Sequence, residues 1–146
     1  MIVNPNSLAA LQTKWQGVIQ MRERMDQLVI STFAFDPISS PVFGNIFYNL
    51  PLLLAFDVFR QVLLQAKEDR QFMDSGQGLA DLLERTRTSL PWLNWQRLQE
   101  GAERQSALVH EGRLFGDKQC LQDIMDIEAQ LLAWGIITAA EPSEVH

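Results

Sequence analysis

The residues best suited to chemistry lie in one short stretch, residues 104–112, which reads Arg-Gln-Ser-Ala-Leu-Val-His-Glu-Gly. It holds His110, and the chain's other histidine is its last residue, His146. Histidine exchanges a proton near neutral pH, and arginine binds a phosphate through parallel hydrogen bonds. Arg104 lies six positions before His110. An arginine and a histidine at this spacing make phosphodiester chemistry the first hypothesis to weigh.

On a straight helix, Arg104 and His110 point in different directions. Six residues separate them by ~120° around the helix axis and by ~9 Å along it. Both could contact one phosphate if the helix unwinds near His110, or if two copies of the helix meet around a twofold axis. Metal-free RNA cleavage needs a proton acceptor, a proton donor and a cation on the phosphate. At the C-terminus of a helix, the negative end of the helix dipole favours the charged form of a histidine. The alternative is structural: Arg104 pairs with Glu100 or Glu103, and His110 only ends the helix.

Other catalytic or metal sites are disfavoured by the sequence. Ser106 lies four positions before His110, but no nucleophile elbow surrounds it and no orienting acid is evident. A bundle-type carboxylate metal site needs Glu-x-x-His motifs from two helices, whereas Glu103 precedes His110 by seven positions. Cys120 is the only cysteine, which excludes an intrachain disulfide and a zinc site of several thiolates. We therefore expect no metal and no cofactor.

Helical periodicity predicts the elements that must position this stretch. Apolar residues at three- and four-residue steps predict helices over about 8–32, 50–66, 79–88, 89–112 and 117–135. The wide apolar surface of the second helix predicts that it is central in its bundle or lies at an oligomer interface. Residues 34–49 are rich in proline and turn residues, so we expect an ordered apolar crossover there. The fold class is therefore all-α, an up-and-down bundle of four to five helices.

Local signals set the expected ends and faces of these helices. The expected N-terminal caps are Asn6 or Ser7, Asn49 (with Pro51 in the first turn), Ser89 (with Pro91 in the first turn) and Asp117. Gly112 is the expected C-terminal cap of the fourth helix, and Val109 is expected on its inward face. Gly101, in mid-helix, costs up to ~1 kcal/mol relative to alanine, which a close helix crossing or a kink would explain. In the last helix we expect Asp123 and Gln130 to face outward.

Composition is that of one soluble globular domain. The 146 residues are 47% hydrophobic and 21% charged, which fits a single domain over 1–146 with a flexible tail at 139–146. The net charge of −6 argues against a general nucleic-acid coat. The most apolar run, residues 50–64, is interrupted by Asp57 and Arg60, so we expect no contact with the membrane interior. Without a signal-peptide pattern, the expected location is cytoplasmic.

Residues 104–112 resemble the signature of the HEPN superfamily, in which an arginine, a polar residue and a short apolar spacer precede a histidine. Five residues separate Arg104 from His110, within the range that the family allows. The family is an all-helical bundle whose signature helix is followed by a loop and a final amphipathic helix, and residues 92–134 fit that order. Gln105 departs from the family pattern, which favours asparagine at this position, often with aspartate or histidine as substitutes.

The resemblance implies a homodimer in which two copies of the signature share one cleft. Many HEPN domains are metal-independent endoribonucleases of toxin–antitoxin, phage-defence and CRISPR-linked systems. By carry-over, Arg104 would contact the phosphate, His110 would transfer a proton or contact RNA, and Gln105 would take the polar position in RNA binding. The predicted function is therefore such a ribonuclease, and a nucleotidyltransferase antitoxin is one protein partner that the family suggests. The alternative is a non-catalytic HEPN-like interaction or RNA-binding module, using the apolar segment 33–48 or the surface of helix 50–66.

Overall fold

The computed structural model describes residues 4–33, 40–68 and 78–138, and they form five helices and no strand. The helices are α1 (Pro5–Phe33), α2 (Ser40–Glu68), α3 (Leu79–Thr86), α4 (Trp95–Glu111) and α5 (Asp117–Ala133). The predicted all-α bundle is therefore confirmed. The expected tail at 139–146 lies outside the described residues.

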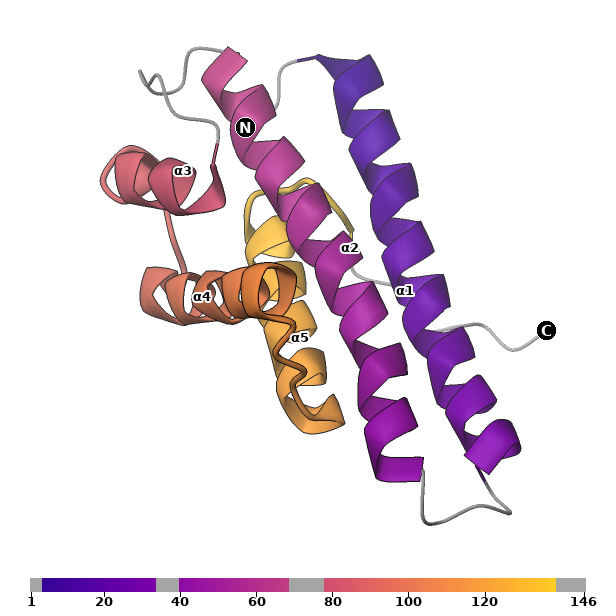
Figure 1. The fold of residues 1–146 in the computed structure, drawn as a ribbon. Coiled ribbons are helices and arrows are strands. Elements are labelled where there is room, and N and C mark those ends of the chain that lie inside the picture. Colours follow the sequence, from indigo (N-terminus) through magenta and orange to yellow (C-terminus); the bar gives the residue numbers. More distant parts are fainter. Residues whose placement is uncertain (1–3, 34–39, 69–77, 139–146) are drawn as a thin grey trace, which may run out of the picture.

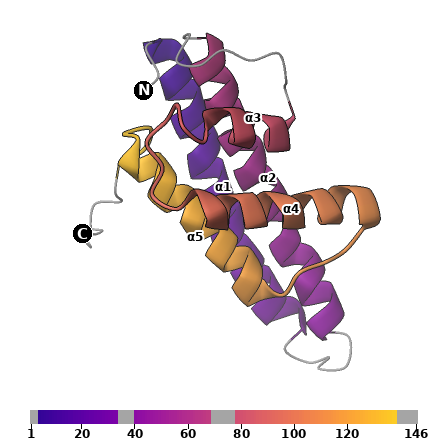
Figure 2. The ribbon, with the colours of Figure 1, turned by 90° about the vertical axis from the view of Figure 1, so that its left-hand side faces the viewer.

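Helices α1, α2 and α5 form the body of the bundle, and α3 and α4 lie across it. In Figure 1, α1 and α2 run antiparallel beside each other, and α5 runs along another side of α2. Within the described residues, α1 and α5 each pack on α2 but not on each other. Figure 2 shows α4 crossing the long helices at a steep angle, and α4 packs on α2, α3 and α5.

Helix α2 is the centre of the hydrophobic core, as its apolar surface predicted. Its inward side chains are buried almost completely: Leu52, Ala55, Phe56, Val58, Phe59, Val62, Leu63 and Ala66. Burying an aliphatic or aromatic side chain contributes ~1.5–3 kcal/mol, so this helix supplies much of the driving force for folding. Only Leu50 and Leu54 remain exposed among its large apolar side chains in the described part. Most of the surface of helix 50–66 is therefore buried inside the bundle.

The predicted crossover at residues 34–49 is wrong for residues 40–49, which are helical. Helix α2 begins at Ser40, and Pro41 falls in its first turn. Backbone N–H groups in the first turn of a helix make no hydrogen bond within that helix, so the N–H that proline lacks is not needed there. Pro51 lies inside the helix instead of in its first turn. Its missing hydrogen bond is tolerated because the packing of α2 outweighs the local preference of its residues. Residues 34–39 lie outside the described part of the chain.

Asn49 does not cap a helix but joins α2 to the link before α5. Its side-chain amide donates to the carbonyl oxygen of Phe115 at 2.8 Å, and its side-chain oxygen accepts from the N–H of Phe115 at 3.2 Å. Asn49 is buried, so these bonds satisfy polar atoms that water does not reach. They fix the position of the segment that follows α4.

Helix α4 begins at Trp95, later than predicted. Asn94 is its N-terminal cap, accepting a hydrogen bond from the N–H of Arg97 at 3.2 Å. Ser89, the expected cap, instead donates its hydroxyl to the carbonyl oxygen of Arg85 at 3.4 Å. The expected inward position of Val109 is also wrong, because its side chain is exposed near the end of α4.

Three indole N–H groups hold the segment between α3 and α4 in a non-helical path. Trp92 donates to the carbonyl of Thr86 at 2.7 Å, and Trp95 donates to the carbonyl of Leu83 at 2.9 Å. Trp134 of the α5 end donates to the carbonyl of Pro91 at 2.7 Å. Helix-capping signals in the sequence do not reveal these three bonds, of which the one from Trp134 joins residues 43 positions apart, and this explains why α4 was expected to begin at Ser89.

The remaining helix ends are set by neighbours of the expected residues. Asn4 caps α1, since its side-chain oxygen accepts from the N–H of Asn6 at 2.9 Å. Gly116 is the N-cap of α5, and Asp117 is its first residue. Gly112, with a φ of 67°, ends α4 in the left-handed conformation as predicted.

No helix within residues 4–33, 40–68 and 78–138 is long and apolar enough to cross a membrane.

Candidate functional site

The candidate site begins at a close crossing of α4 over α2 and α5. A Cβ atom on Gly101 would lie 2.9 Å from Cζ of Phe56 and 3.5 Å from Oδ1 of Asp123. A larger residue than glycine would force Phe56 or the helix to move. The predicted close crossing at Gly101 is therefore confirmed, and it brings α4 within reach of a carboxylate on α5.

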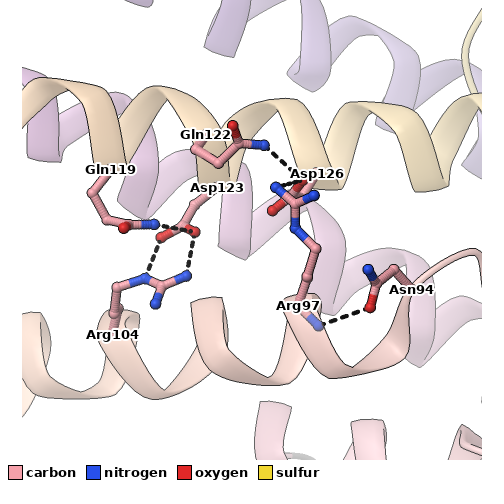
Figure 3. Close-up of polar contacts among 7 residues, drawn as sticks. All are labelled: Asn94, Arg97, Arg104, Gln119, Gln122, Asp123 and Asp126. Atoms are coloured by element: carbon pink, nitrogen blue, oxygen red, sulfur yellow. Dashed lines mark hydrogen bonds and ion pairs between the residues drawn. The ribbon is translucent and has the colours of Figure 1, made fainter.

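Arg104 forms a two-pronged ion pair with this carboxylate (Figure 3). Its Nε donates to Oδ2 of Asp123 at 2.8 Å, and its Nη2 donates to Oδ1 at 2.6 Å. Gln119, one turn earlier on α5, donates its amide to Oδ1 of Asp123 at 3.1 Å. The Asp123 side chain is 1% exposed, and that of Arg104 is 24% exposed. The carboxylate is thus fully enclosed, and its partners come from both helices.

The electrostatics of this pair fix the charge of Arg104. Hydrogen bonding to Asp123 raises the pKa of Arg104 above its already high ordinary value, outweighing the opposite effect of burial, while the charges of Asp123, Glu100 and Asp126 add to the rise. A buried carboxylate without a cation would be costly, so Asp123 needs this arginine. The expectation that Asp123 faces outward is wrong. The structural alternative for Arg104 is realised, but with Asp123 as partner instead of Glu100 or Glu103.

A second arginine on α4 makes a much more exposed pair with α5. Nη2 of Arg97 lies 3.0 Å from Oδ1 of Asp126, and the two side chains are 46% and 16% exposed. Gln122 donates to the same carboxylate at 3.0 Å, as Figure 3 shows. Two arginines two turns apart on α4 thus face two carboxylates one turn apart on α5, but only the Arg104 pair is shielded from solvent.

His110 lies in the last turn of α4, exposed, and makes no hydrogen bond or ion pair to any described residue. It lines a depression of about 430 Å³ between α3 and α4, together with Glu103, Gln105 and Ser106. The wall from α3 and the start of α4 is apolar: Leu79, Ala80, Leu83 and Trp95. No lysine or arginine is among the described residues that line this depression.

Arg104 lines a different depression, of about 440 Å³, on the other side of Glu103. Arg113 and Gln119 contribute to it, as do Glu100 and Glu103, so its described lining holds two cations and two carboxylates. Within one chain, then, the fold does not bring Arg104 and His110 together, as the angle between them on a straight helix predicted. Gln105, the expected RNA-binding neighbour, lies with His110 and away from Arg104.

This geometry limits the chemistry that Arg104 can perform. One of the two guanidinium edges that can bind a phosphate through parallel hydrogen bonds, the edge formed by Nε and Nη2, already binds Asp123. A phosphate at that edge would have to displace a buried carboxylate. No group of three or more metal-binding side chains is present among the described residues.

Comparison with known proteins returned no match for this chain, whether with protein-family models, with curated proteins or with solved structures. Membership of the HEPN superfamily therefore stays a prediction from residues 104–112.

Proposed function

We propose that this protein is a non-catalytic helical interaction module that associates with itself, of the kind found among HEPN-like domains. The observation that carries the proposal is the ion pair of Arg104 with the enclosed Asp123. A side chain that neutralises a buried carboxylate stabilises the fold. We therefore expect the loss of Arg104 to lower the free energy of unfolding, and not primarily to remove an activity. The net charge of −6 also disfavours binding to a polyanion.

The end of α4 is the surface best suited to self-association. Val109 and Leu114 are both more than 40% exposed, and they flank His110 in sequence. In Figure 2 this end of α4 extends beyond α2. Two exposed apolar side chains, one at this end of α4 and one in the link that follows it, support a contact between two copies here. Of the apolar segment 33–48, residues 34–39 lie outside the described residues.

Two measurements test the proposal. Sedimentation equilibrium should give a concentration-dependent dimer for the wild type and a monomer for Val109→Asp, because a charge in an apolar contact is strongly unfavourable. Leu93→Asp, at another exposed apolar position, is the matched control and should leave the dimer intact. Fluorescence anisotropy with labelled single-stranded RNA should show no saturable binding at physiological salt. A wild-type monomer at all concentrations, or tight RNA binding that Arg104→Lys weakens, would contradict the proposal.

The second candidate is a metal-independent endoribonuclease of toxin or phage-defence type, with a composite site in the dimer. Its support is that His110 is exposed and makes no hydrogen bond or ion pair to any described residue, which would leave its side chain available for proton transfer. Arg104 would have to leave Asp123 and reach a phosphate beside the histidine of the other copy. A nucleotidyltransferase antitoxin would then be a natural protein partner.

Mixing two inactive variants separates this candidate from the first. Arg104→Ala lacks the cation and His110→Ala lacks the proton carrier, so each homodimer would be inactive. A mixed dimer keeps one site in which the arginine of one copy meets the histidine of the other. Cleavage by the mixture and not by either variant would establish the composite ribonuclease and overturn the non-catalytic proposal.

A further inference from the structure

A groove runs between α1 and α5 on the side of the bundle away from α3 and α4. It encloses about 620 Å³ and is lined from α1 by Trp15, Ile19 and Glu23 and from α5 by Glu128 and Leu132. Both helices pack on α2 and not on each other within the described residues, so α2 lies beneath the groove. Gln12 closes one end, donating to the carbonyl oxygen of Ile136 at 2.8 Å. Among the described residues, no helix occupies the place that a fourth helix would take beside these three.

The α5 wall continues beyond the enclosed part as an exposed apolar stripe. Leu121, Met125, Glu128 and Leu132 follow each other at steps of four, three and four residues, which places them within ~60° on one side of α5. Leu121 is 43% exposed and Met125 is 49% exposed. Steps of three and four are the spacing by which one helix packs along another. The spacing of the stripe therefore suits a helix, and no helix of residues 4–33, 40–68 and 78–138 packs on it.

The α1 wall repeats the same spacing and the same charge. Gln12, Gln16, Ile19 and Glu23 also follow at steps of four, three and four. Each wall thus carries one glutamate in its stripe, and neither Glu23 nor Glu128 has a hydrogen-bond or ion-pair partner among the described residues. Among the described residues that line the groove, Arg22 is the one cation, and together with Glu23 and Glu128 it gives this part of the lining one negative charge.

These charges distinguish between possible occupants. If a second copy inserted its own α1 or α5, it would place Glu23 or Glu128 against the same residues, and like charges in contact are unfavourable. An amphipathic helix with a lysine or arginine within its apolar stripe would instead meet both carboxylates. Its leucine-like side chains would cover Met125 and Leu132 on one wall and Ile19 on the other.

We propose that the groove between α1 and α5 binds an amphipathic helix of a partner protein that carries a basic residue within its apolar stripe. This inference rests on the proposed interaction function and names its second surface. The dimer contact at the end of α4 would stay available, because it lies on the other side of the bundle (Figure 2). Binding of the helix would complete a four-helix arrangement around α2.

The test uses a synthetic helical peptide of about 18 residues, ~27 Å long at 1.5 Å per residue, which matches the 17 residues of α5. Leucines at steps of three and four form its apolar stripe, with one lysine at the centre. A second peptide has glutamate in place of this lysine, and a third has the same residues in scrambled order. With the full-length wild type, anisotropy should show tightest binding of the lysine peptide, roughly fivefold tighter than the glutamate peptide.

Variants of the protein decide whether the groove is responsible. Glu128→Lys should reverse the preference between the two peptides, and Met125→Lys should weaken binding of the lysine peptide roughly tenfold. Leu93→Lys, which changes an apolar residue that is 65% exposed and outside the groove, should leave binding unchanged. Circular dichroism establishes that each variant is folded.

The inference is overturned if the ordered peptides bind no better than the scrambled one, if Glu128→Lys does not reverse the preference, or if Leu93→Lys weakens binding as much as Met125→Lys. These outcomes are independent of RNA cleavage and of the dimer. A failed inference is therefore distinguishable from a failed interaction function.

Discussion

Replacing Arg104 by alanine should destabilise the protein far more than replacing Arg97, although both arginines lie on α4 and pair with an aspartate of α5. Asp123 is 1% exposed, so Arg104→Ala leaves a buried carboxylate whose one remaining partner among the described residues is the amide of Gln119. Removing one member of a buried pair costs about 3–5 kcal/mol, and we expect the lower end because Arg104 itself is 24% exposed.

The matched control is Arg97→Ala. The Arg97 side chain is 46% exposed, so water replaces much of its interaction with Asp126. Exposed pairs contribute about 0–1 kcal/mol. Asp123→Asn is a third variant, which removes the buried charge together with its need for a cation, and it should cost only about 1–2 kcal/mol.

Urea unfolding followed by circular dichroism measures these differences. With a slope of about 2 kcal/mol per M, Arg104→Ala should lower the midpoint by ~1.5 M, and Arg97→Ala by less than ~0.5 M. Equal, small losses for the two variants would refute the structural role of Arg104 and leave its guanidinium free for a substrate.

The pH dependence of the pair follows from the direction of the pKa shift. The pKa of Arg104 is raised in the folded protein, mainly by its hydrogen bonds to Asp123. A raised pKa gives stability that is fully present below the unfolded value and is lost only as pH rises through the folded value. That value lies above the range in which the protein can be studied, so deprotonation of Arg104 should not weaken the pair between neutral pH and pH ~10.

Two further predictions concern the elements that hold α4. Gly101→Ala should destabilise the protein by about 1–3 kcal/mol, because the added Cβ would meet Phe56. Gly17→Ala in α1, where the added Cβ has open space around it, should stabilise the protein by ~0.5–1 kcal/mol. Thermal unfolding should therefore show a lower midpoint for the first variant and a higher midpoint for the second. Asn94→Ala should cost ~1 kcal/mol through loss of the α4 cap, and Ser89→Ala should cost clearly less, which urea midpoints would show.

Much of the fold could be predicted from periodicity, because a helix that buries one face repeats its apolar residues every three or four positions. The central place of α2, the C-terminal cap at Gly112 and the close crossing at Gly101 follow from that pattern and from two glycines. The start of α2 at Ser40 could not, because a segment with Pro41 and other turn residues has a weak local preference for helix, which packing overrides. Local preference also misplaced the start of α4, where indole hydrogen bonds from distant residues decide the path.

Only part of the candidate site could be predicted from the sequence. The angle between Arg104 and His110 on one helix could be calculated, and the two residues indeed line separate depressions. The partner of Arg104 could not be found in this way, because Asp123 is buried by a crossing between helices and not by the pattern of its own helix. The one available signal was Gly101, three residues before Arg104, since a glycine at a close crossing marks the place where a buried ion pair can span two helices.

The most direct test of the account is an RNA-cleavage assay in a metal chelator, with structured and single-stranded RNAs as substrates. Wild type, His110→Ala and Arg104→Ala are compared, each after its folding has been established. If Arg104 serves the fold and the protein is an interaction module, none of the three should cleave RNA above the buffer control. Cleavage by the wild type that both substitutions abolish, with the fold retained, would contradict the account.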